Sequence, residues 1–272
     1  MCGANSIKIV NQDEVNTEEW KHFTSSCSTA TIYHLPEWSQ VLKKTFGYES
    51  FNLFARNGDG RICGVLPLAL VKSLTGSRLV SLPFSYICGP LKKLDSTLPL
   101  FLETAKELCR ALNCDYLEIR SAANGLTGEA TSFWSLHGFH SSNQFSTFVL
   151  ELSQPDTVWK KLDAKSVRWA IRKARKDGVT VRKSRAGEDI DLFYHLNLRT
   201  KKRLGVPAHP KRLLQQMFQE LGEHSQLYLA ELPLLDSITN LQMTPSAFLA
   251  SSSITTPSPM LARIASNFSL ST

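Results

Sequence analysis

Long apolar runs and paired cysteines are missing from this sequence of 272 residues. No run of about 18 apolar residues occurs, so we expect no membrane-spanning helix. The first twenty residues lack a charged start followed by an apolar block, so no secretory signal is expected. None of the six cysteines forms a C-x-x-C pair. This predicts reduced thiols, a cytoplasmic location and no metal site.

The common catalytic motifs are missing as well. The chain has no P-loop, no dinucleotide-type glycine motif and no metal triad. Gly-x-Ser-x-Gly is also absent, so no hydrolase nucleophile is indicated. Tyr194 and His195 are available as bases, but their pattern is that of ordinary helix residues. The catalytic residues therefore stay unassigned.

Positive charge, by contrast, is concentrated in one place. Residues 159–185 hold eleven Lys and Arg and two Asp, a net charge of +9, whereas the whole chain carries +7. The rest of the chain is therefore slightly acidic. A locally dense positive field attracts anions, most often phosphates.

Within this stretch, residues 165–177 have helical spacing. Four residues form an apolar stripe that we expect to dock on a core: Val167, Ala170, Ile171 and Ala174. A second stripe, well over 90° around the axis, is a ladder of cations: Lys165, Arg168, Arg172 and Arg175. Gly178 is expected to end the helix. Arginine grips phosphate with a planar fork, which predicts an anion-binding face. The alternative is a solvated face whose cations suit the helix dipole.

Strand and helix patterns alternate along the rest of the chain and indicate an α/β fold with mixed sheets. Strands are expected at 6–10, 51–56, 61–71, 78–82, 116–120, 145–150, 179–181 and 226–231. Helices are expected at 17–23, 36–46, 98–112, 189–203 and 210–221. The turn at residues 57–60, Asn-Gly-Asp-Gly, is a hairpin signal. Two further places draw attention: a Pro- and Gly-containing loop at 81–90, and an aromatic cluster of Tyr33, His34 and Trp38 at a helix start. An ordinary turn and core packing are the alternatives.

Several stretches resemble one known family. HLPEW, GVLPLALVKS and LVSLPFSYICGPL are similar to the opening of the Fem-type (FemAB) peptidyltransferases. LDAKSVRWAIRKARKDGVTV resembles that family's signature helix, and RLGVPAHPKRLLQQMF the segment that follows it. The resemblance covers residues 33–232, is most specific at 165–178, and is greatest to the branch associated with exosortase and exopolysaccharide genes.

The resemblance implies two tandem acetyltransferase-like (GNAT-like) domains and a transferase activity. An activated acyl or aminoacyl group would pass to an amine of a cell-envelope precursor or a polysaccharide-related substrate. The implied co-substrate is aminoacyl-tRNA or acyl-CoA, with no bound cofactor. The implied partner is a polyanion: charged tRNA, acyl-CoA or a nucleotide- or lipid-linked precursor, with peripheral contact to a membrane surface left open.

The resemblance also implies site residues. Candidate phosphate contacts are Lys165, Arg168, Arg172, Lys173 and Arg175. Candidate groove-lining residues on the first domain are Tyr33, His34, Trp38, Ser85, Tyr86, Gly89 and Pro90.

The end of the chain departs from the family. Among residues 233–272 only Asp236 and Arg263 are charged, and fourteen are Ser or Thr. We therefore expect a first domain at 1–150, a partial second domain at 151–232, and a disordered or out-of-frame tail at 233–272 that would impair activity. A genuine low-complexity tail is the alternative.

Two other functions use the same cations. One is an acyl-CoA-dependent N-acyltransferase, although the Gly-rich pyrophosphate loop of that class is missing. The other is a non-catalytic RNA-binding module, although interleaved aromatic residues are missing.

Overall fold

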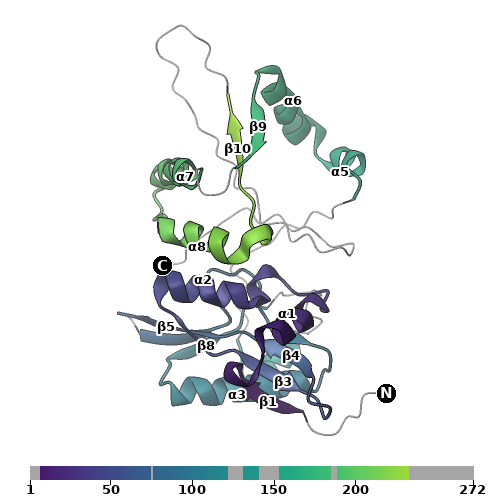
Figure 1. Ribbon diagram of the computed structural model, residues 1–272, viewed down its shortest axis with the longest axis vertical. Coiled ribbons are helices and arrows are strands. Elements are labelled where there is room, and N and C mark those ends of the chain that lie inside the picture. Colours follow the sequence, from purple (N-terminus) through teal and green to yellow (C-terminus); the bar gives the residue numbers. More distant parts are fainter. Residues whose placement is uncertain (1–6, 75, 122–130, 141–152, 185–188, 233–272) are drawn as a thin grey trace. The chain divides into compact units, whose positions relative to one another are not determined.

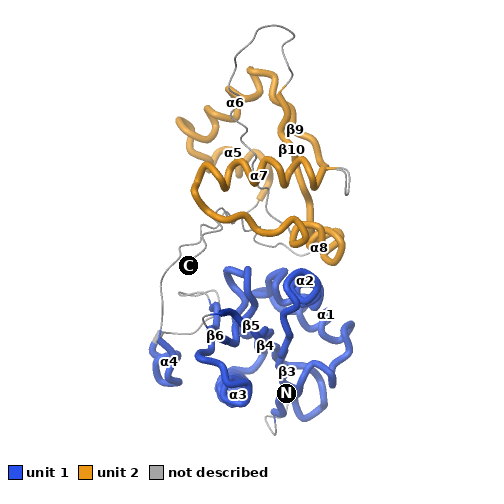
Figure 2. The backbone as a smooth tube through the Cα atoms, turned by 90° about the vertical axis from the view of Figure 1, so that its left-hand side faces the viewer, with its two compact units in different colours: residues 1–145 blue, residues 146–272 orange. Residues whose placement is uncertain are grey.

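Strands and helices alternate throughout the computed structural model (Figure 1), which confirms the predicted α/β class. The structure describes residues 7–74, 76–121, 131–140, 153–184 and 189–232. The chain forms two compact units, Met1–Phe145 and Ser146–Thr272 (Figure 2). The strand expected at 145–150 and the segment 233–272 lie outside the described residues.

Two four-stranded sheets form the centre of the first unit. The first has the order β1-β3-β4-β7 and contains β1 (Lys8–Asn11), β3 (Leu53–Arg56), β4 (Ile62–Leu66) and β7 (Leu91–Lys92). The second has the order β2-β5-β6-β8 and contains β2 (Glu49–Ser50), β5 (Ala69–Ser73), β6 (Gly76–Val80) and β8 (Tyr116–Glu118). β6 and β8 pair in parallel, with Leu79 opposite Leu117, and the other pairs are antiparallel.

The two sheets separate where Pro67 interrupts a strand. We predicted one strand over residues 61–71, but β4 ends at Leu66 and β5 begins at Ala69. Proline has no backbone N–H to donate to a sheet, so the ladder breaks there. The buried side chain of Asn52 bridges the gap, because its Oδ1 accepts from the N–H of Leu68 at 3.2 Å.

Helices cover both faces of the first sheet. α1 (Thr17–Ser25) packs on one face through Trp20 and Phe23, which join Phe54 in a buried cluster. α3 (Thr97–Ala111) packs on the other through Phe101, which joins Leu53. Leu53 and Phe54 are neighbours in β3 and belong to the buried clusters on opposite faces of the sheet. Side chains along a strand alternate between the two faces in this way. α2 (Pro36–Phe46) ends where predicted, at Gly47 with a φ of 74°, and α4 (Thr131–Leu136) follows later in the unit.

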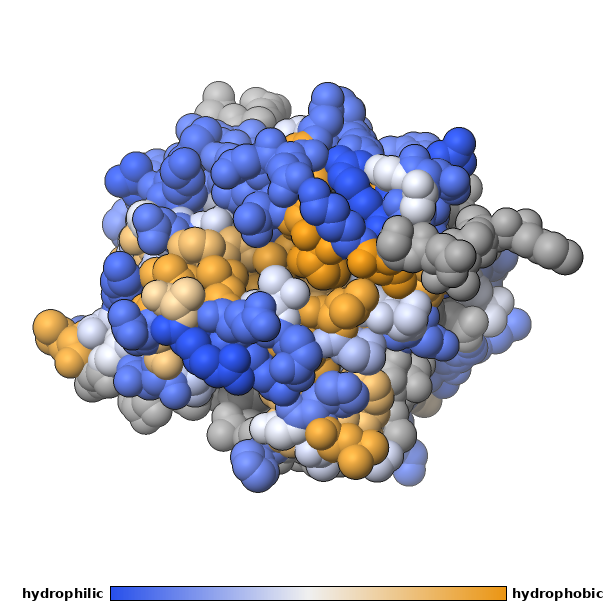
Figure 3. Space-filling view, turned by 90° about the horizontal axis from the view of Figure 1, so that it is seen from below, coloured by the Kyte–Doolittle hydropathy of each residue, from blue (hydrophilic) through white to orange (hydrophobic). Residues whose placement is uncertain are grey.

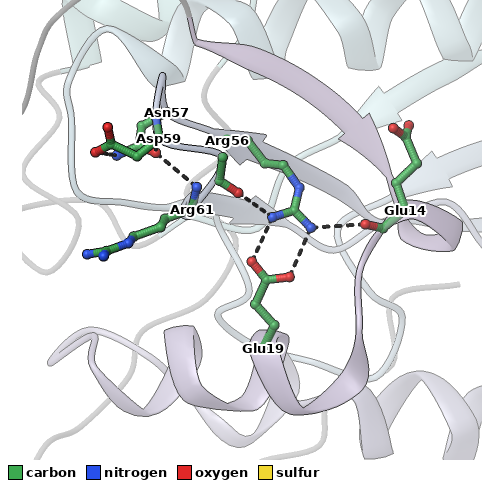
Figure 4. A network of polar contacts seen from close by, with 7 residues as sticks. Glu14, Glu19, Arg56, Asn57, Asp59 and Arg61 are labelled. Carbon is green, nitrogen blue, oxygen red and sulfur yellow. Dashed lines mark hydrogen bonds and ion pairs between the residues drawn. The ribbon is translucent and has the colours of Figure 1, made fainter.

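The predicted hairpin at residues 57–60 is confirmed, since it joins the antiparallel strands β3 and β4. Beside it, Arg56 ties three segments together (Figure 4). Its guanidinium binds both carboxylate oxygens of Glu19 at 2.7 and 2.9 Å and the carbonyl oxygens of Glu14 and Gly60 at 2.9 and 2.5 Å. Each terminal nitrogen of Arg56 thus makes two hydrogen bonds, which hold the start of α1 against the sheet. Arg56 therefore has a structural role.

In the second unit, the described residues form four α-helices and a two-stranded antiparallel ribbon. Its helices are α5 (Pro155–Lys161), α6 (Trp169–Lys176), α7 (Ile190–Leu204) and α8 (Lys211–Leu221), with a π-helical turn η3 (Ala164–Arg168) before α6. β9 (Thr180–Lys183) pairs antiparallel with β10 (Tyr228–Glu231). Arg182 of β9 binds Asp189, directly before α7, at 2.7 and 2.9 Å, and Glu231 of β10 at 2.7 Å. The Arg182 guanidinium therefore has a structural role in the second unit.

Apolar surface is not confined to the interior. Figure 3 shows a strip of hydrophobic residues flanked by hydrophilic ones on one face of the molecule. Among the described residues, however, no helix is both long and apolar enough to cross a bilayer. The described cysteines carry free thiols: Cys27, Cys63, Cys88, Cys109 and Cys114.

Candidate functional site

The helix that we predicted at residues 165–177 begins with a π turn and not with a regular α-helical turn. The N–H of Arg168 donates to the carbonyl oxygen of Asp163, five residues earlier, at 3.0 Å. The Asp163 carboxylate caps the turn by accepting from the N–H and the hydroxyl of Ser166 at 2.7 and 2.5 Å. These hydrogen bonds lower the pKa of Asp163. π turns inside helices are frequent at functional sites.

The π turn changes the predicted ladder at its first member. A 100° step does not apply between Lys165 and Arg168, so Lys165 is set at a different angle from the one predicted. From Arg168, whose φ and ψ are −65° and −36°, the chain continues as a regular α-helix. Arg168, Arg172 and Arg175 are four and three residues apart and fall within an arc of about 60°. We call these three residues the α6 cation row.

The predicted docking of the apolar stripe on a core is wrong for half of its members. No residue of η3 or α6 is buried. Val167 and Ala170 are exposed, and Ile171 and Ala174 are half-buried. Trp169 is 59% exposed. The segment is thus open to solvent on more than its cationic side.

The contacts of the five predicted phosphate-binding side chains differ. Lys173 pairs with Asp177 at 2.5 Å, an exposed pair that contributes little and that an anion could replace. The guanidinium of Arg172 lies 5.8 Å from the centre of the Trp159 ring, a cation–π contact. Among the described residues, the Nε of Arg168 is buried without a hydrogen-bond partner.

Lys165 and Arg175 are exposed, and no described residue pairs with their side chains. Within the described part of the chain, Arg168, Arg172 and Arg175 form no ion pair with a carboxylate. Gly178, with a φ of 84°, ends the helix as predicted, and the N–H of Val179 bonds the carbonyl oxygen of Ala174 at 3.0 Å.

In the first unit the structure brings together the predicted aromatic residues and the loop at 81–90. The ring of Tyr33 packs edge-on against Trp38 at 4.8 Å and against Tyr86 at 5.2 Å between ring centres. Burial raises the pKa of Tyr33. Tyr86 is the exposed member of this set, at 37%, whereas Ser85, Gly89 and Pro90 are buried. Their role in lining a groove stays a prediction.

His34 is buried and fully hydrogen-bonded. A carbonyl oxygen only accepts, so the Nε2 of His34 carries the proton that it donates to the oxygen of Gly89 at 2.8 Å. The Nδ1 then accepts from the N–H of Thr31 at 3.0 Å, with the Thr31 hydroxyl 2.9 Å away. Burial lowers the pKa of His34 to about 4, against the hydrogen bonds, which raise it. This neutral histidine joins the α2 start to the loop.

Sequence reasoning missed Arg120, which holds the loop from the other side. Its N–H donates to the hydroxyl of Ser81 at 2.6 Å, and its guanidinium to the carbonyl oxygen of Ser85 at 2.6 Å. Its own carbonyl accepts from the N–H of Cys88 at 2.9 Å. Leu82 and Phe84 have φ values of 57° and 60°, which are unfavourable outside glycine. No local pattern reveals Arg120, because its contacts arise from the parallel pairing of β6 and β8.

No general base emerges from the described residues. His195 is exposed and Tyr194 half-buried on α7. His209 is half-buried, and burial lowers its pKa. No three His, Cys, Asp or Glu side chains in the described part of the chain could hold a metal ion.

Comparison with a model of the FemAB family gives a match over residues 135–252, less than half of the chain. The match includes η3 and the α6 cation row. It also includes residues 233–252, so the family boundary that we predicted at residue 233 is not supported by this comparison and stays a prediction. None of the curated proteins matches the sequence.

The fold is that of the solved structure of FemX. The two superpose with a TM-score of 0.62 at 20% identity, over 83% of this chain and 58% of that one. The chain thus spans little more than half the length of FemX. Two acetyltransferase structures score lower. An aminoglycoside 6'-N-acetyltransferase from Acinetobacter baumannii has a TM-score of 0.36 and 12% identity, over 54% of this chain and 100% of its own. A glucosamine N-acetyltransferase region of a fungal β-N-acetylglucosaminidase has 0.41 and 13%, over 85% and 26%. The fold assignment therefore depends on FemX.

Proposed function

We propose that this chain takes part in acyl or aminoacyl transfer to an amine, and that the α6 cation row binds phosphates of the donor or the acceptor. One observation carries the proposal: a row of three guanidinium groups, two exposed and one half-buried, lies within the residues that match the FemAB model. The FemX fold supports the same class of reaction.

The transfer reaction mainly requires the protein to position the donor and the amine. The amine nitrogen attacks the carbonyl carbon of the donor, and the ester C–O or thioester C–S bond breaks. The amine loses one proton, and the leaving oxygen or sulfur takes one up. Holding the two reactants in the right geometry can supply about 7–11 kcal/mol of the barrier. No resident nucleophile is required, which fits a described site without one.

Both proposed substrates are polyanions. Charged tRNA and acyl-CoA carry phosphates on the donor side, and a nucleotide- or lipid-linked cell-envelope precursor carries them on the acceptor side. Arg168, Arg172 and Arg175 can each bind a phosphate through two N–H groups. The groove-lining role of Tyr33, Trp38 and the loop at 81–90 stays a prediction for the first unit, where Tyr86 offers an exposed ring. The exopolysaccharide branch and an impaired activity stay predictions.

A binding experiment with the full chain tests the proposal. Affinities for charged tRNA, acyl-CoA and a nucleotide-linked muropeptide would be measured for the wild type and for Arg168→Gln with Arg172→Gln. We expect one of these ligands to bind about 100-fold more weakly to the double variant, because two charge-assisted hydrogen-bonding groups are lost. Lys43→Gln with Lys72→Gln is the matched control, since both lysines are exposed on the first unit.

The ligand that responds also separates the alternatives. A response to acyl-CoA alone favours the N-acyltransferase. A response to uncharged as well as charged tRNA, without transfer, favours the RNA-binding module. Equal binding of all three ligands by the wild type and the double variant contradicts the proposed role of the α6 cation row.

A further inference from the structure

Two of the described cysteines, Cys109 and Cys114, lie at the point where α3 ends. Asn113, with a φ of 51°, reverses the chain there. The N–H of Asn113 donates to the carbonyl oxygen of Arg110 at 3.0 Å, and the N–H of Cys114 donates to that of Cys109 at 2.9 Å. These two bonds define a Schellman motif, in which the third-last helical residue and the second residue after the C-cap commonly pack their side chains together. In this chain both of those residues are cysteines.

The motif brings the two thiols close to each other. The Sγ of Cys109 lies 3.9 Å from the carbonyl oxygen of Cys114, and Cys114 packs against the buried cluster to which Cys109 belongs. With standard bond lengths, the backbone hydrogen bond between the two residues keeps their Cα atoms within about 7 Å of each other. A disulfide can span Cα atoms up to about 7 Å apart. The two free thiols are thus placed for a bond to each other.

Hydrogen bonds to β6 hold the turn that carries Cys114. The carboxylate of Asp115 accepts from the N–H of Ser77 at 2.7 Å, and the N–H of Asp115 donates to the carbonyl oxygen of Ser77 at 2.8 Å. The hydroxyl of Ser77 donates to the carbonyl oxygen of Asn113 at 2.9 Å. The residues on both sides of Cys114 are therefore fixed, so the folded chain would lose little further freedom when a disulfide forms.

The two thiols differ in their access to solvent. Cys109 is 8% exposed, and burial, followed by the neighbouring Cys114, raises the pKa of Cys109 to about 11. Cys114 is half-buried, so a small reagent has access to it. Because the thiolate is the attacking form, Cys109 is the poorer first nucleophile. Oxidisable cysteines are commonly accessible and lie next to a second thiol that resolves the first product. Cys114 suits the first role and Cys109 the second.

We propose that Cys109 and Cys114 form a reversible intramolecular disulfide when the chain meets a low-molecular-weight disulfide such as oxidised glutathione. The Cys114 thiolate attacks one sulfur of the oxidant, which forms a mixed disulfide and releases one glutathione thiolate. The Cys109 thiolate then displaces the second glutathione, and the protein S–S bond forms. The two protein thiols lose two electrons and two protons, and the oxidant becomes two thiols. The disulfide requires no acyl transfer, so it is independent of the proposed function.

Mass spectrometry of the full chain tests whether the disulfide forms. Folded protein is equilibrated with oxidised and reduced glutathione, free thiols are alkylated, and the chain is digested with trypsin without reduction. Trypsin cleaves after Lys106, Arg110 and Arg120, so the two cysteines fall on separate peptides. We expect peptides 107–110 and 111–120 to be joined by one disulfide, and to be separated again by excess reduced glutathione.

The same measurement in urea tests whether the fold places the two sulfurs. In the folded chain the pair should stay oxidised at a value of [GSH]²/[GSSG] about tenfold higher than in the urea-unfolded chain, because only the folded chain holds the two cysteines together. Both measurements use the wild-type chain, so they do not depend on the folding of a variant.

Variants assign the two roles. In Cys109→Ala the mixed disulfide of glutathione with Cys114 should accumulate, because no second thiol displaces the glutathione. In Cys114→Ala no joined peptides should form, and Cys109 should be modified about 10-fold more slowly than Cys114 is in the other variant. Cys27→Ala is the matched control, since it removes another buried thiol of the same unit, and it should give the joined peptides as the wild type does.

Three results would each overturn the proposal. They are the absence of joined peptides in the folded wild type, equal oxidation of the folded and the urea-unfolded chain, and a disulfide that pairs either cysteine with a different one. None of these results bears on the α6 cation row.

Discussion

The Nε2 of His34 donates to the carbonyl oxygen of Gly89 at 2.8 Å, across 55 residues of sequence. An imidazolium could still make this bond, but the Nδ1 of His34 accepts from the N–H of Thr31 only when the imidazole is neutral and protonated at Nε2. His34 therefore joins the start of α2 to the loop at 81–90 as a neutral group. Its protonation should remove the acceptor for the Thr31 N–H and place a charge in a fully buried position.

This predicts a loss of stability in acid. The pKa of His34 is about 4 in the folded chain and near 6.5 in the unfolded one. The unfolded state therefore binds the proton first, and stability falls as pH drops from about 6.5 to about 4. The contribution that is lost is about 3 kcal/mol. Urea unfolding at a series of pH values measures it.

Other groups titrate in the same range, so His34→Gln is the comparison. This variant should be less stable at neutral pH, and its free energy of unfolding should fall less steeply between pH 6.5 and 4. A variant with the same pH dependence as the wild type would show that His34 is not the group responsible.

A second prediction concerns Gly64 in β4. A Cβ atom there would lie 2.9 Å from ring and methyl carbons of Phe101 and Thr97. Gly64→Ala should therefore destabilise the chain by about 1–3 kcal/mol through overpacking. Phe101→Leu should recover part of this loss in the double variant, although it costs stability alone. A Gly64→Ala variant as stable as the wild type would mean that α3 can move away from the sheet without loss of stability.

Much of the first unit could be predicted because its signals are local. Pro36 and Gly47 mark the ends of α2, and the turn at residues 57–60 marks a hairpin. What local signals omit is pairing between distant segments. Arg120 reaches the loop at 81–90 because β8 lies parallel to β6, and no spacing in the sequence shows this. Pro67 is enough to predict the break between β4 and β5. The apolar residues on both sides of it suggested one continuous strand instead.

In the second unit the residue types were predicted better than their geometry. Residues 165–177 are helical and basic as expected, but the Asp163 cap closes a π turn that an assumed 100° step does not anticipate. The apolar spacing of Val167 and Ala170 suggested burial, whereas both are exposed. Periodicity shows which residues share a face and does not show what covers that face.

A third prediction concerns salt. If a nucleic acid binds the α6 cation row, its affinity should fall linearly with the logarithm of salt concentration. Arg168→Gln with Arg172→Gln removes two phosphate contacts, so the slope should become shallower by about 1.4–1.8. Titrations of charged tRNA at several salt concentrations measure both slopes. An identical slope for the double variant would place the phosphates elsewhere.

The most direct test of the proposed function is a transfer assay with the full chain. Purified protein would be given an activated acyl or aminoacyl donor and a nucleotide-linked amine acceptor, and amide formation would be followed by mass spectrometry. We predict product with the wild type and a kcat/KM about 100-fold lower for Arg168→Gln with Arg172→Gln, with Lys43→Gln and Lys72→Gln unaffected. Unchanged kinetics of the α6 double variant, at low and at moderate ionic strength, would contradict the account.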